Sequence, residues 1–520
     1  AGSNISHFAL YLNDDWNGVE NDNIYWKQET SHMASDIVKI GEDLSSGDFN
    51  PGLITNGLSS SSSTSENTNN VEIYGSIGTN VIFDQENTYT GTTVIKNGAT
   101  LQLSQNLTFS DITVESGGSL KINDNNVQIK SLNISDGGSL VIESGKALTI
   151  LNNFSNSGTV TAQSGSSLII NGNSSGDITY NRTLSTTNWY LTSSPVVGET
   201  IQDVISNHDF ATGSGSNIGL ATYTTSDNTW DYLTSSSTGT ISSGTGYAVK
   251  LASAGDISFS GTMKVDDASI ALTTSGSNGF NLVGNPYPSF IAANNSADGT
   301  NNILKVNDTD NDYLTEATLW FWNQSTNSYD QINHATSARH IAPGQGFFVS
   351  SNGNNTLSIT EDMQSHQGTD TFQRPASRPE IELTMTDGSD TSNADIFYIE
   401  GTTTGWDNGY DSSIFGGVAN DFAIYTHAVE NGAGRNLGIQ SLPPDNYENM
   451  IIPVGINAIS GTEISIDASI TNFPEGMNVY LEDKEDDSFT LLDGSANFTT
   501  TLASDLNGIG RFYLHTTAGS

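Results

Sequence analysis

The phrase GGSLKI at residues 117–122 returns as GGSLVI at residues 137–142 and, in a looser form, as GTVTA at residues 158–162. Apolar and polar residues alternate in each phrase, which is typical of strands with one buried face. The central apolar position recurs at intervals of 19, 20 and 20 residues, at Leu101, Leu120, Leu140 and Val160. This period, with Gly or Asn at the corners, predicts a short parallel β-solenoid, because a single coil cannot bury its own apolar face. An antiparallel meander with similar hairpins is the alternative.

A second, longer duplication lies within residues 180–370. Its first copy contains the landmarks NWYLTSSP, TWDY and GTGYAV, at residues 188–195, 229–232 and 244–249. The second copy contains GFNLVGNP, NSYD and GQGFFV, at residues 279–286, 327–330 and 344–349. Corresponding landmarks keep their order and lie about 91 to 100 residues apart. The pattern predicts one β unit present twice, packed face to face as a β-sandwich or as a pair of small ones.

The whole chain is therefore predicted to be all-β. Residues 1–70 are interpreted as an N-terminal β segment with a Ser-rich linker, and residues 71–179 as the solenoid. The duplicated β-sandwich region, residues 180–370, follows. Residues 380–520 again alternate apolar and polar positions between turn signals, which predicts a C-terminal immunoglobulin-like β-sandwich.

Composition narrows the classes of function. The formal net charge is −42, from 58 acidic and 16 basic residues, which argues against a nucleic-acid binder because phosphate contacts need clustered Lys and Arg. The absence of Cys excludes disulfides and Cys-ligated metals. No apolar run reaches the length of a transmembrane helix. The sequence opens at Ala1 without a leader, as expected of a mature exported protein, and a trimmed sequence would look the same.

One acidic loop has a spacing that suits calcium. Asp308, Asp310 and Asp312 alternate along the chain and Glu316 follows, as in the front of a calcium-binding loop. Tyr313 stands where the EF-hand loop requires Gly, so the site would be of another type. A solvated acidic loop without metal is the alternative.

Two further acidic groups are weaker candidates for calcium. One consists of Asp407, Asn408 and Asp411. The other is N-terminal and consists of Asp14, Asp15, Glu20 and Asp22. Calcium at any of these places would rigidify a loop instead of taking part in catalysis.

The sequence carries no zinc-protease, Walker or dinucleotide-binding motif, and no catalytic residue is predicted. Four tryptophans could form a sugar-stacking platform: Trp189, Trp230, Trp320 and Trp322. They occupy matched places in the duplicated unit, which favours packing in the core over ligand binding.

Several phrases resemble a known group of proteins. They are GTGY at residues 244–247, NLVGNPYPS at 281–289, PGQGFFV at 343–349, DNGYD at 407–411, FGG at 415–417 and NLGIQSLP at 436–443. They are similar to the C-terminal half of large secreted proteins of Bacteroidota that are cargo of type IX secretion. The resemblance implies export, followed by release or attachment at the outer cell surface. Such proteins usually end in a sorting domain, and since this sequence stops at Ser520 without one, we expect a form from which it was removed on export or by trimming.

We therefore expect a non-catalytic secreted cell-surface protein, adhesin-like or structural, that contacts an extracellular glycan or protein. One alternative is a subunit of a self-assembling filament or surface layer, since open solenoid ends and sheet edges can pair with other copies. The other alternative is the ancillary glycan-binding region of a secreted polysaccharide-degrading enzyme.

Overall fold

The computed structural model describes residues 8–9, 37–41, 47–51, 70–84, 89–105, 108–276, 278–367, 378–418, 421–430, 434–444, 450–493 and 497–518. Strands dominate these residues, and the helices among them are α1 (Ile201–Asn207), a π-helical turn at Lys305–Thr309 and a 3-10 turn at Glu361–Met363. The predicted all-β class is confirmed. None of the described helices has the length and apolar character that crossing a membrane requires.

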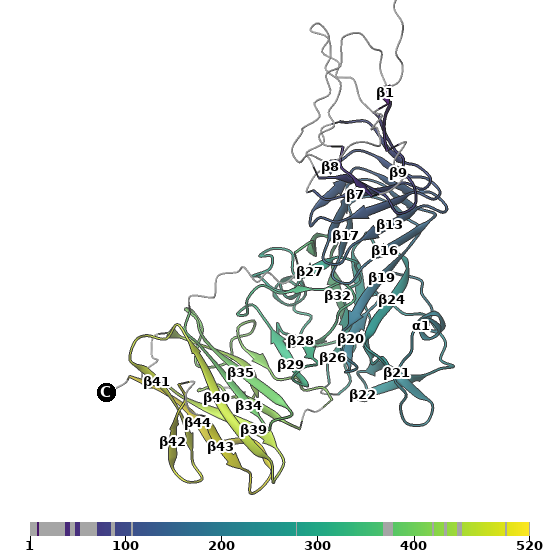
Figure 1. Cartoon of the computed structure of the whole chain (residues 1–520). Helices are drawn as coiled ribbons and strands as arrows, with labels where there is room; N and C mark the ends of the chain where they lie inside the picture. The colour runs from purple at the N-terminus through teal and green to yellow at the C-terminus, as the bar shows by residue number, and fades with distance from the viewer. Residues whose placement is uncertain are drawn as a thin grey trace, which may run out of the picture.

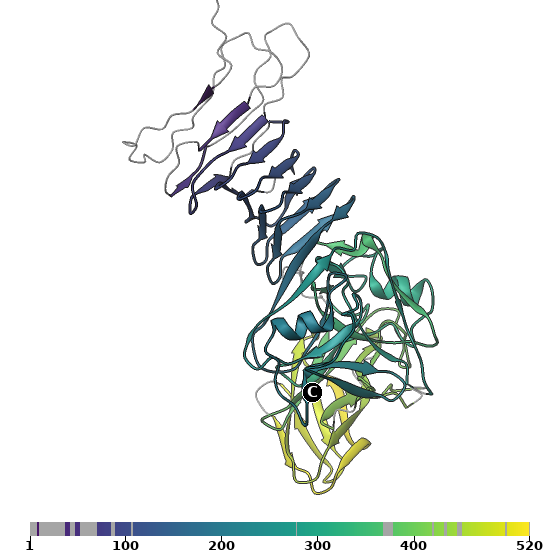
Figure 2. The same cartoon turned by 90° about the vertical axis from the view of Figure 1, so that its right-hand side faces the viewer.

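The first part of the chain is a parallel β-solenoid with three faces (Figures 1 and 2). One face contains β1 (Phe8–Ala9), β2 (Ile37–Ile40), β4 (Asn70–Ile73), β6 (Thr93–Ile95), β9 (Ile112–Val114), β12 (Leu132–Ile134), β15 (Phe154–Asn156) and β18 (Ser174–Ser175). The second contains β3 (Asp48–Phe49), β5 (Asn80–Phe83), β7 (Thr100–Leu103), β10 (Ser119–Ile122), β13 (Ser139–Ile142), β16 (Thr159–Ala162) and β19 (Asp177–Leu184). The third contains β8 (Thr108–Phe109), β11 (Val127–Ile129), β14 (Ala147–Ile150) and β17 (Ser167–Ile170).

Successive coils pair in the register that the sequence repeat predicted. Leu120 pairs in parallel with Leu101 on one side and Leu140 on the other. Leu140 pairs in turn with Val160. The solenoid is thus confirmed, and the antiparallel meander is wrong. Parallel pairing of β2 with β4 and of β3 with β5 shows that the stacking begins before residue 71.

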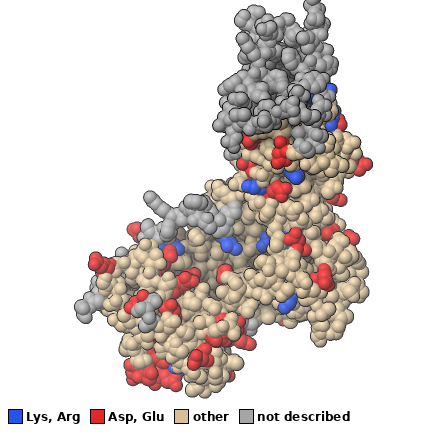
Figure 3. Space-filling model, viewed as in Figure 1, with Lys and Arg blue, Asp and Glu red and all other residues tan. Residues whose placement is uncertain are grey.

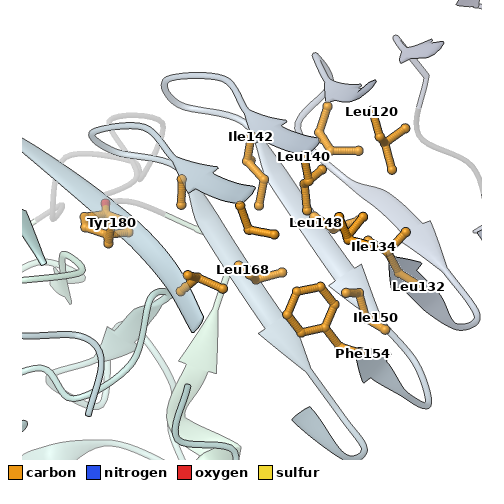
Figure 4. Packing of buried hydrophobic residues seen from close by; sticks show 14 of the residues in the cluster. Leu120, Leu132, Ile134, Leu140, Ile142, Leu148, Ile150, Phe154, Leu168 and Tyr180 are labelled. Atoms are coloured by element: carbon orange, nitrogen blue, oxygen red, sulfur yellow. The ribbon is translucent and has the colours of Figure 1, made fainter. Parts of the chain in front are cut away.

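The solenoid has a continuous apolar core (Figure 4). Leu120, Leu140 and Leu148 are fully buried, and they stack on their counterparts in neighbouring coils. The corner residues Gly117 and Gly137 both have a φ of 76°, a left-handed conformation that glycine adopts without strain. The repeated Gly-Gly-Ser-Leu phrase therefore supplies a corner and then the first buried residue of a strand.

Residues 177–262 (copy 1) and 268–359 (copy 2) share one topology, so the predicted duplication is confirmed. The copy 1 sheet has the order β20 (Tyr190–Ser193), β23 (Gly246–Val249), β21 (Asn217–Thr224) and β22 (Thr229–Thr234). The copy 2 sheet has the order β26 (Phe280–Gly284), β31 (Gly346–Ser350), β28 (Leu319–Asn323) and β29 (Ser328–Ile332). Each copy adds an antiparallel pair: β19 with β24 (Gly255–Thr262), and β25 (Ala268–Ala271) with β32 (Thr356–Ile359).

The two copies meet at their Gly-x-Gly-aromatic motifs. Isolated bridges join Thr192 of copy 1 to Gln345 of copy 2, and Thr245 of copy 1 to Val283 of copy 2. The two bridges are equivalent, because Thr192 corresponds to Val283 and Thr245 corresponds to Gln345. A Cβ atom on Gly246 would lie 2.8 Å from the carbonyl oxygen of Val283 and 2.6 Å from Cγ of Leu282. A Cβ atom on Gly346 would lie 2.9 Å from the carbonyl oxygen of Thr192. Glycine is needed at both positions because the backbones approach too closely for any side chain.

The solenoid is attached to the two copies in different ways. Copy 1 shares its apolar core with the solenoid, because β19 belongs to both and its Tyr180 is fully buried. Copy 2 contributes β27 (Phe290–Ala292) and β30 (His340–Ile341) to a small sheet. The third strand, β33 (Gln364–Ser365), directly follows copy 2 and lies against the third solenoid face. Beside it, His366 bonds through its two ring nitrogens to the hydroxyls of Thr149 and Ser167, at 2.7 and 2.8 Å.

The C-terminal domain is one sheet that curls around a separate core. It contains β34 (Glu380–Thr386), β35 (Thr391–Tyr398), β36 (Ser412–Ser413), β37 (Ala423–Thr426), β38 (Leu437–Leu442), β39 (Met450–Ala458), β40 (Glu463–Thr471), β41 (Met477–Asp483), β42 (Ser488–Leu491), β43 (Phe498–Thr501) and β44 (Leu506–Ala518). The core includes Ile396, Val454 and Leu514. The sandwich-like form is as predicted, but the strands belong to one nearly closed sheet and not to the two separate sheets of an immunoglobulin-like domain.

Candidate functional site

Aromatic side chains gather where the copy 1 and copy 2 sheets face each other. The buried members of this aromatic cluster are Leu191, Ala221, Ala248, Leu282, Trp320, Phe348 and Phe415. Its partly buried members are Trp189, Tyr223, Trp230, Phe280, Trp322 and Tyr329. Successive strand residues point to opposite faces. Val249 accordingly lies in the solenoid core while its neighbour Ala248 faces the cluster.

Strand register shows which positions of the two copies correspond. Tyr223 pairs with Trp230 across the β21–β22 hairpin, and Trp322 pairs with Tyr329 across the β28–β29 hairpin. The ring centroids are 5.5 Å apart in the first pair and 5.1 Å apart in the second, and both pairs meet edge to face. Edge-to-face contact is the favoured geometry of aromatic pairs. The same aromatic pair thus occurs once in each copy.

A pocket of about 220 Å³ adjoins the aromatic cluster and is lined mostly by copy 1. It is lined by Trp189, Leu191, Trp230, Tyr232, Ala248, Trp322, Asn327, Tyr329 and Val418. Five of the nine come from copy 1, three from copy 2 and one from the C-terminal domain. The three tryptophans are only partly buried, so parts of their surfaces face the opening.

The pocket exists because copy 1 has a small residue where copy 2 has a large one. Ala248 pairs with Leu191 in copy 1, as Phe348 pairs with Leu282 in copy 2. Ala221 corresponds to Trp320 of copy 2, because Ala221 pairs with Ala248 on the next strand as Trp320 pairs with Phe348. Ala248 lines the pocket and leaves unfilled the space that the Phe348 ring occupies in copy 2, whereas Ala221 is fully buried and does not line it.

In copy 2 the corresponding place is filled by Phe415 from the C-terminal domain. Its ring centroid lies 4.0 Å from that of Tyr329 and 4.7 Å from those of Phe280 and Phe348. Only 8% of Phe415 is exposed. By strand register these three partners correspond to pocket residues of copy 1: Trp230, Trp189 and Ala248.

The four tryptophans singled out in the sequence have two different roles. Trp320 is fully buried, and its Nε1 donates to the carbonyl oxygen of Ser413 at 2.9 Å, so core packing is right for this residue. Trp189, Trp230 and Trp322 line the pocket. Sequence reasoning missed Phe415 as a packing partner. The available signal was the difference between Ala248 in the first Gly-x-Gly-aromatic phrase and the aromatic residue in the second.

The first predicted calcium loop is mostly engaged with protein groups. Oδ2 of Asp308 accepts a hydrogen bond from Nδ2 of Asn408 at 3.1 Å, while Oδ1 is buried without a hydrogen-bond partner. Burial raises the pKa of this carboxyl. Asp310 forms an ion pair with Lys305 at 3.0 Å. Asp312 is exposed and has a left-handed φ of 53°.

Glu316 lies apart from the exposed part of that loop. Only 5% of its side chain is exposed, and Oε2 accepts a hydrogen bond from the backbone N–H of Ser413 at 2.8 Å. Nη1 of Arg435 is 3.8 Å from Oε1. Burial raises the pKa of Glu316, and the contacts with Ser413 and Arg435 oppose that rise.

The second predicted loop folds back on its own backbone. Oδ2 of Asp411 accepts from the N–H of Asp407 at 2.7 Å, and its Oδ1 accepts from the N–H of Ser441 at 2.6 Å. Oδ2 of Asp407 accepts from the N–H of Thr403 at 2.6 Å. Burial raises the pKa of Asp411 to about 7, against the opposing effect of its backbone donors.

The structure brings the two acidic loops together at the junction of copy 2 and the C-terminal domain. Asn408 joins them, since it donates to Asp308 and its Oδ1 accepts from the N–H of Ala317 at 2.9 Å. Within the described residues, no three Asp, Glu or His side chains are arranged so that they could hold a metal ion. Calcium here stays a prediction, and the third acidic group, residues 14–22, lies outside the described residues.

Comparison with known proteins gives a family without an assigned activity. Residues 125–515 match the model of a family described as a domain of unknown function, DUF8693. This segment covers the last coils of the solenoid, both copies and almost all of the C-terminal domain, and so includes every residue that lines the pocket. No curated protein and no solved structure matches the chain.

Proposed function

We propose that this chain, which belongs to the DUF8693 family, is a non-catalytic, adhesin-like protein of the bacterial cell surface that holds a ring-bearing group of its ligand in the aromatic pocket. The pocket itself carries the proposal. None of its nine lining residues has a carboxylate, imidazole or amino group, and all of them except Asn327 present apolar or aromatic surface. Such a lining favours stacking and burial of a ring over acid–base chemistry.

The architecture supports display of this pocket on a stiff support. Solenoid coils add up to a rod, and the rod shares its core with copy 1, which supplies most of the pocket (Figure 2). The pocket would therefore be held at a fixed distance and orientation from the solenoid. Export by type IX secretion is part of the proposal and rests on the sequence resemblance.

Surface charge restricts the ligands that can approach. Acidic groups are spread over the face in Figure 3, most densely at the lower end of the C-terminal domain, and basic groups are few. A net charge of −42 repels polyanions. Neutral glycans and neutral or basic protein surfaces remain as ligand classes.

The pocket variant Ala248→Phe gives the direct test of binding. The labelled chain would be applied to a glycan array and to an array of peptides, with the variant in parallel and Gly255→Ala as a control outside the pocket. We expect the hits of the wild-type chain to survive in the control and to disappear in A248F. Hits that persist unchanged in A248F, or the absence of any hit, would refute the proposed binding function.

Location is tested separately on the producing cells. Antibody labelling of intact cells and brief protease treatment should detect and remove the protein without lysis. Protection from protease in intact cells, with release only after lysis, would contradict the surface location and leave the binding assay as the remaining evidence for function.

A further inference from the structure

The duplication supplies an internal example of what the open pocket binds. In copy 2 the place corresponding to the pocket is occupied by Phe415, which is followed by Gly416 and Gly417. A Cβ on Gly416 would lie 3.2 Å from the ring of Phe280. A Cβ on Gly417 would fall within 2.1 Å of the ring of Phe415 itself. The loop therefore combines one large aromatic ring with a position, Gly417, that has no room for a side chain, and leaves little room for one at Gly416.

The walls around Phe415 have close counterparts in the open pocket. Trp189 corresponds to Phe280, and Trp230 corresponds to Tyr329, so two of the three nearest rings are aromatic in both copies. The third counterpart is Ala248, which replaces Phe348 and makes the open site roomier. Both places thus offer two aromatic walls with an apolar floor.

The size of the pocket favours one side chain over a longer ligand. Its volume of about 220 Å³ lies below the roughly 300–1,000 Å³ of typical small-molecule sites. Buried aromatic anchors in small apolar pockets are a common basis of protein–protein recognition. The exposed Tyr232 and Val418, 44% and 36% exposed, would form a rim around such an anchor.

We propose that the open pocket of copy 1 binds a loop of a partner protein that presents a phenylalanine followed by small residues, in the manner in which copy 2 binds Phe415. The proposal rests on the proposed binding function and names its ligand class. Because the chain is strongly acidic, a partner loop with neutral or basic flanks would associate faster than an acidic one. A sugar ring is the competing occupant, and the experiment separates the two.

The test uses a peptide that copies residues 413–418, SIFGGV, with both ends blocked. Titration into the full chain is followed by calorimetry and by the fluorescence of the pocket tryptophans. We expect one peptide per chain. We also expect a 10- to 100-fold loss of affinity when the peptide's Phe is replaced by Ala, since that ring accounts for most of the buried apolar area.

Variants of the protein locate the binding. Ala248→Phe should abolish peptide binding because it fills the pocket as Phe348 fills the corresponding space. Tyr232→Ala, at the exposed rim, should weaken binding about 3- to 10-fold and keeps the test valid if A248F does not fold. Phe415→Ala vacates the copy 2 site, and the stoichiometry should rise from one peptide to two.

The outcomes distinguish this inference from the proposed function. Equal peptide binding by wild type, A248F and Y232A, or no peptide binding at all, overturns the inference. If glycans then bind in a manner that A248F abolishes, the pocket is a sugar site and the proposed function stands. If nothing binds in a pocket-dependent manner, both fail.

Discussion

The two copies of the repeated unit have the same strand order but treat the space beside their sheets differently. Copy 1 leaves it open between Trp189 and Trp230, whereas copy 2 fills it with Phe348 from its own strand and Phe415 from another domain. A duplicated fold can thus keep its topology while the difference between Ala248 and Phe348 changes the use of one surface. In copy 2 that surface fixes the C-terminal domain, and in copy 1 it remains accessible.

Removal of the Trp320 ring, which has no aromatic counterpart in copy 1, should give the largest effect on stability. Trp320→Ala empties a fully buried site and removes the Nε1 hydrogen bond to Ser413. We expect a loss of about 3–5 kcal/mol in the free energy of unfolding, since large-to-small changes leave a cavity. Denaturant unfolding measured by near-ultraviolet circular dichroism would give this value.

Trp230→Ala is the tryptophan removal to compare in the open copy, where Ala221 already stands at the position of Trp320. Trp230 is partly exposed beside an existing pocket, so its removal creates little new cavity, and the loss should be about half as large or less. Equal losses for the two variants would mean that copy 1 is packed as tightly as copy 2 and that the contrast between them is wrong.

The pH dependence of stability should reveal the separate docking of copy 2 on the solenoid. Burial lowers the pKa of His366 to about 4, so the ring is neutral in the native state. In the unfolded chain the imidazole of His366 has its ordinary pKa of about 6.5 and is protonated below that pH. The stabilisation is therefore complete above pH 6.5 and is lost as the pH falls toward 4, by up to about 3 kcal/mol.

Other groups titrate in the same range, so the prediction concerns a difference. His334 has a pKa lowered to about 4 by burial and acts in the same direction. Asp411, with a pKa raised to about 7, acts in the opposite direction, because its native state gains a proton as the pH falls. The stability of wild type minus that of His366→Gln, measured at pH 7 and pH 4.5, isolates the one ring. A constant difference would contradict the assignment.

Much of the solenoid could be predicted because its repeat is local. The spacing of Leu101, Leu120 and Leu140 fixes which residues stack, and the same leucines pair in the structure. Corner glycines add an independent signal, because a left-handed φ is costly for other residues. The duplication was visible for the same reason, since its landmarks recur in order.

The candidate site could not be predicted in the same way. Phe415 lies about 67 residues from Phe348 in sequence, and no local pattern links an aromatic residue after a turn to a pocket in another domain. Asp308 and Asp411 were recognised as separate acidic loops, but not their meeting through Asn408. The sandwich-like form of the C-terminal domain could be predicted, but its single, nearly closed sheet could not, because alternation reports a buried face without the order of the strands.

The close approach of the two copies offers a test of their symmetry. Gly246→Ala and Gly346→Ala should each cost about 1–3 kcal/mol, because the new methyl group would meet atoms of the opposite copy at 2.6 and 2.9 Å. Gly255→Ala is the control, since nothing lies within 4 Å of its added Cβ. Urea unfolding of the three variants would measure these costs. Tolerance of one glycine change but not the other would show that the contacts in the two directions are not equivalent.

The smallest effect on stability should come from the pocket rim. Tyr232 is 44% exposed, and its one ring contact is with Trp189 at 5.8 Å among the described aromatic pairs. Tyr232→Ala should therefore cost less than about 1 kcal/mol of unfolding free energy. Differential scanning calorimetry would measure this change. Gln331 holds the corresponding position in copy 2, beside Gly438 of the C-terminal domain, and is the matched variant.

These two rim variants should separate binding from assembly. Tyr232→Ala should lower the affinity for the phenylalanine peptide and leave the domain interface intact. Gln331→Ala should leave peptide binding unchanged but increase protease cleavage between copy 2 and the C-terminal domain, because Gln331 packs against that domain. If both variants weakened peptide binding equally, the open and filled sites would behave as one coupled cluster, since Tyr329 belongs to both.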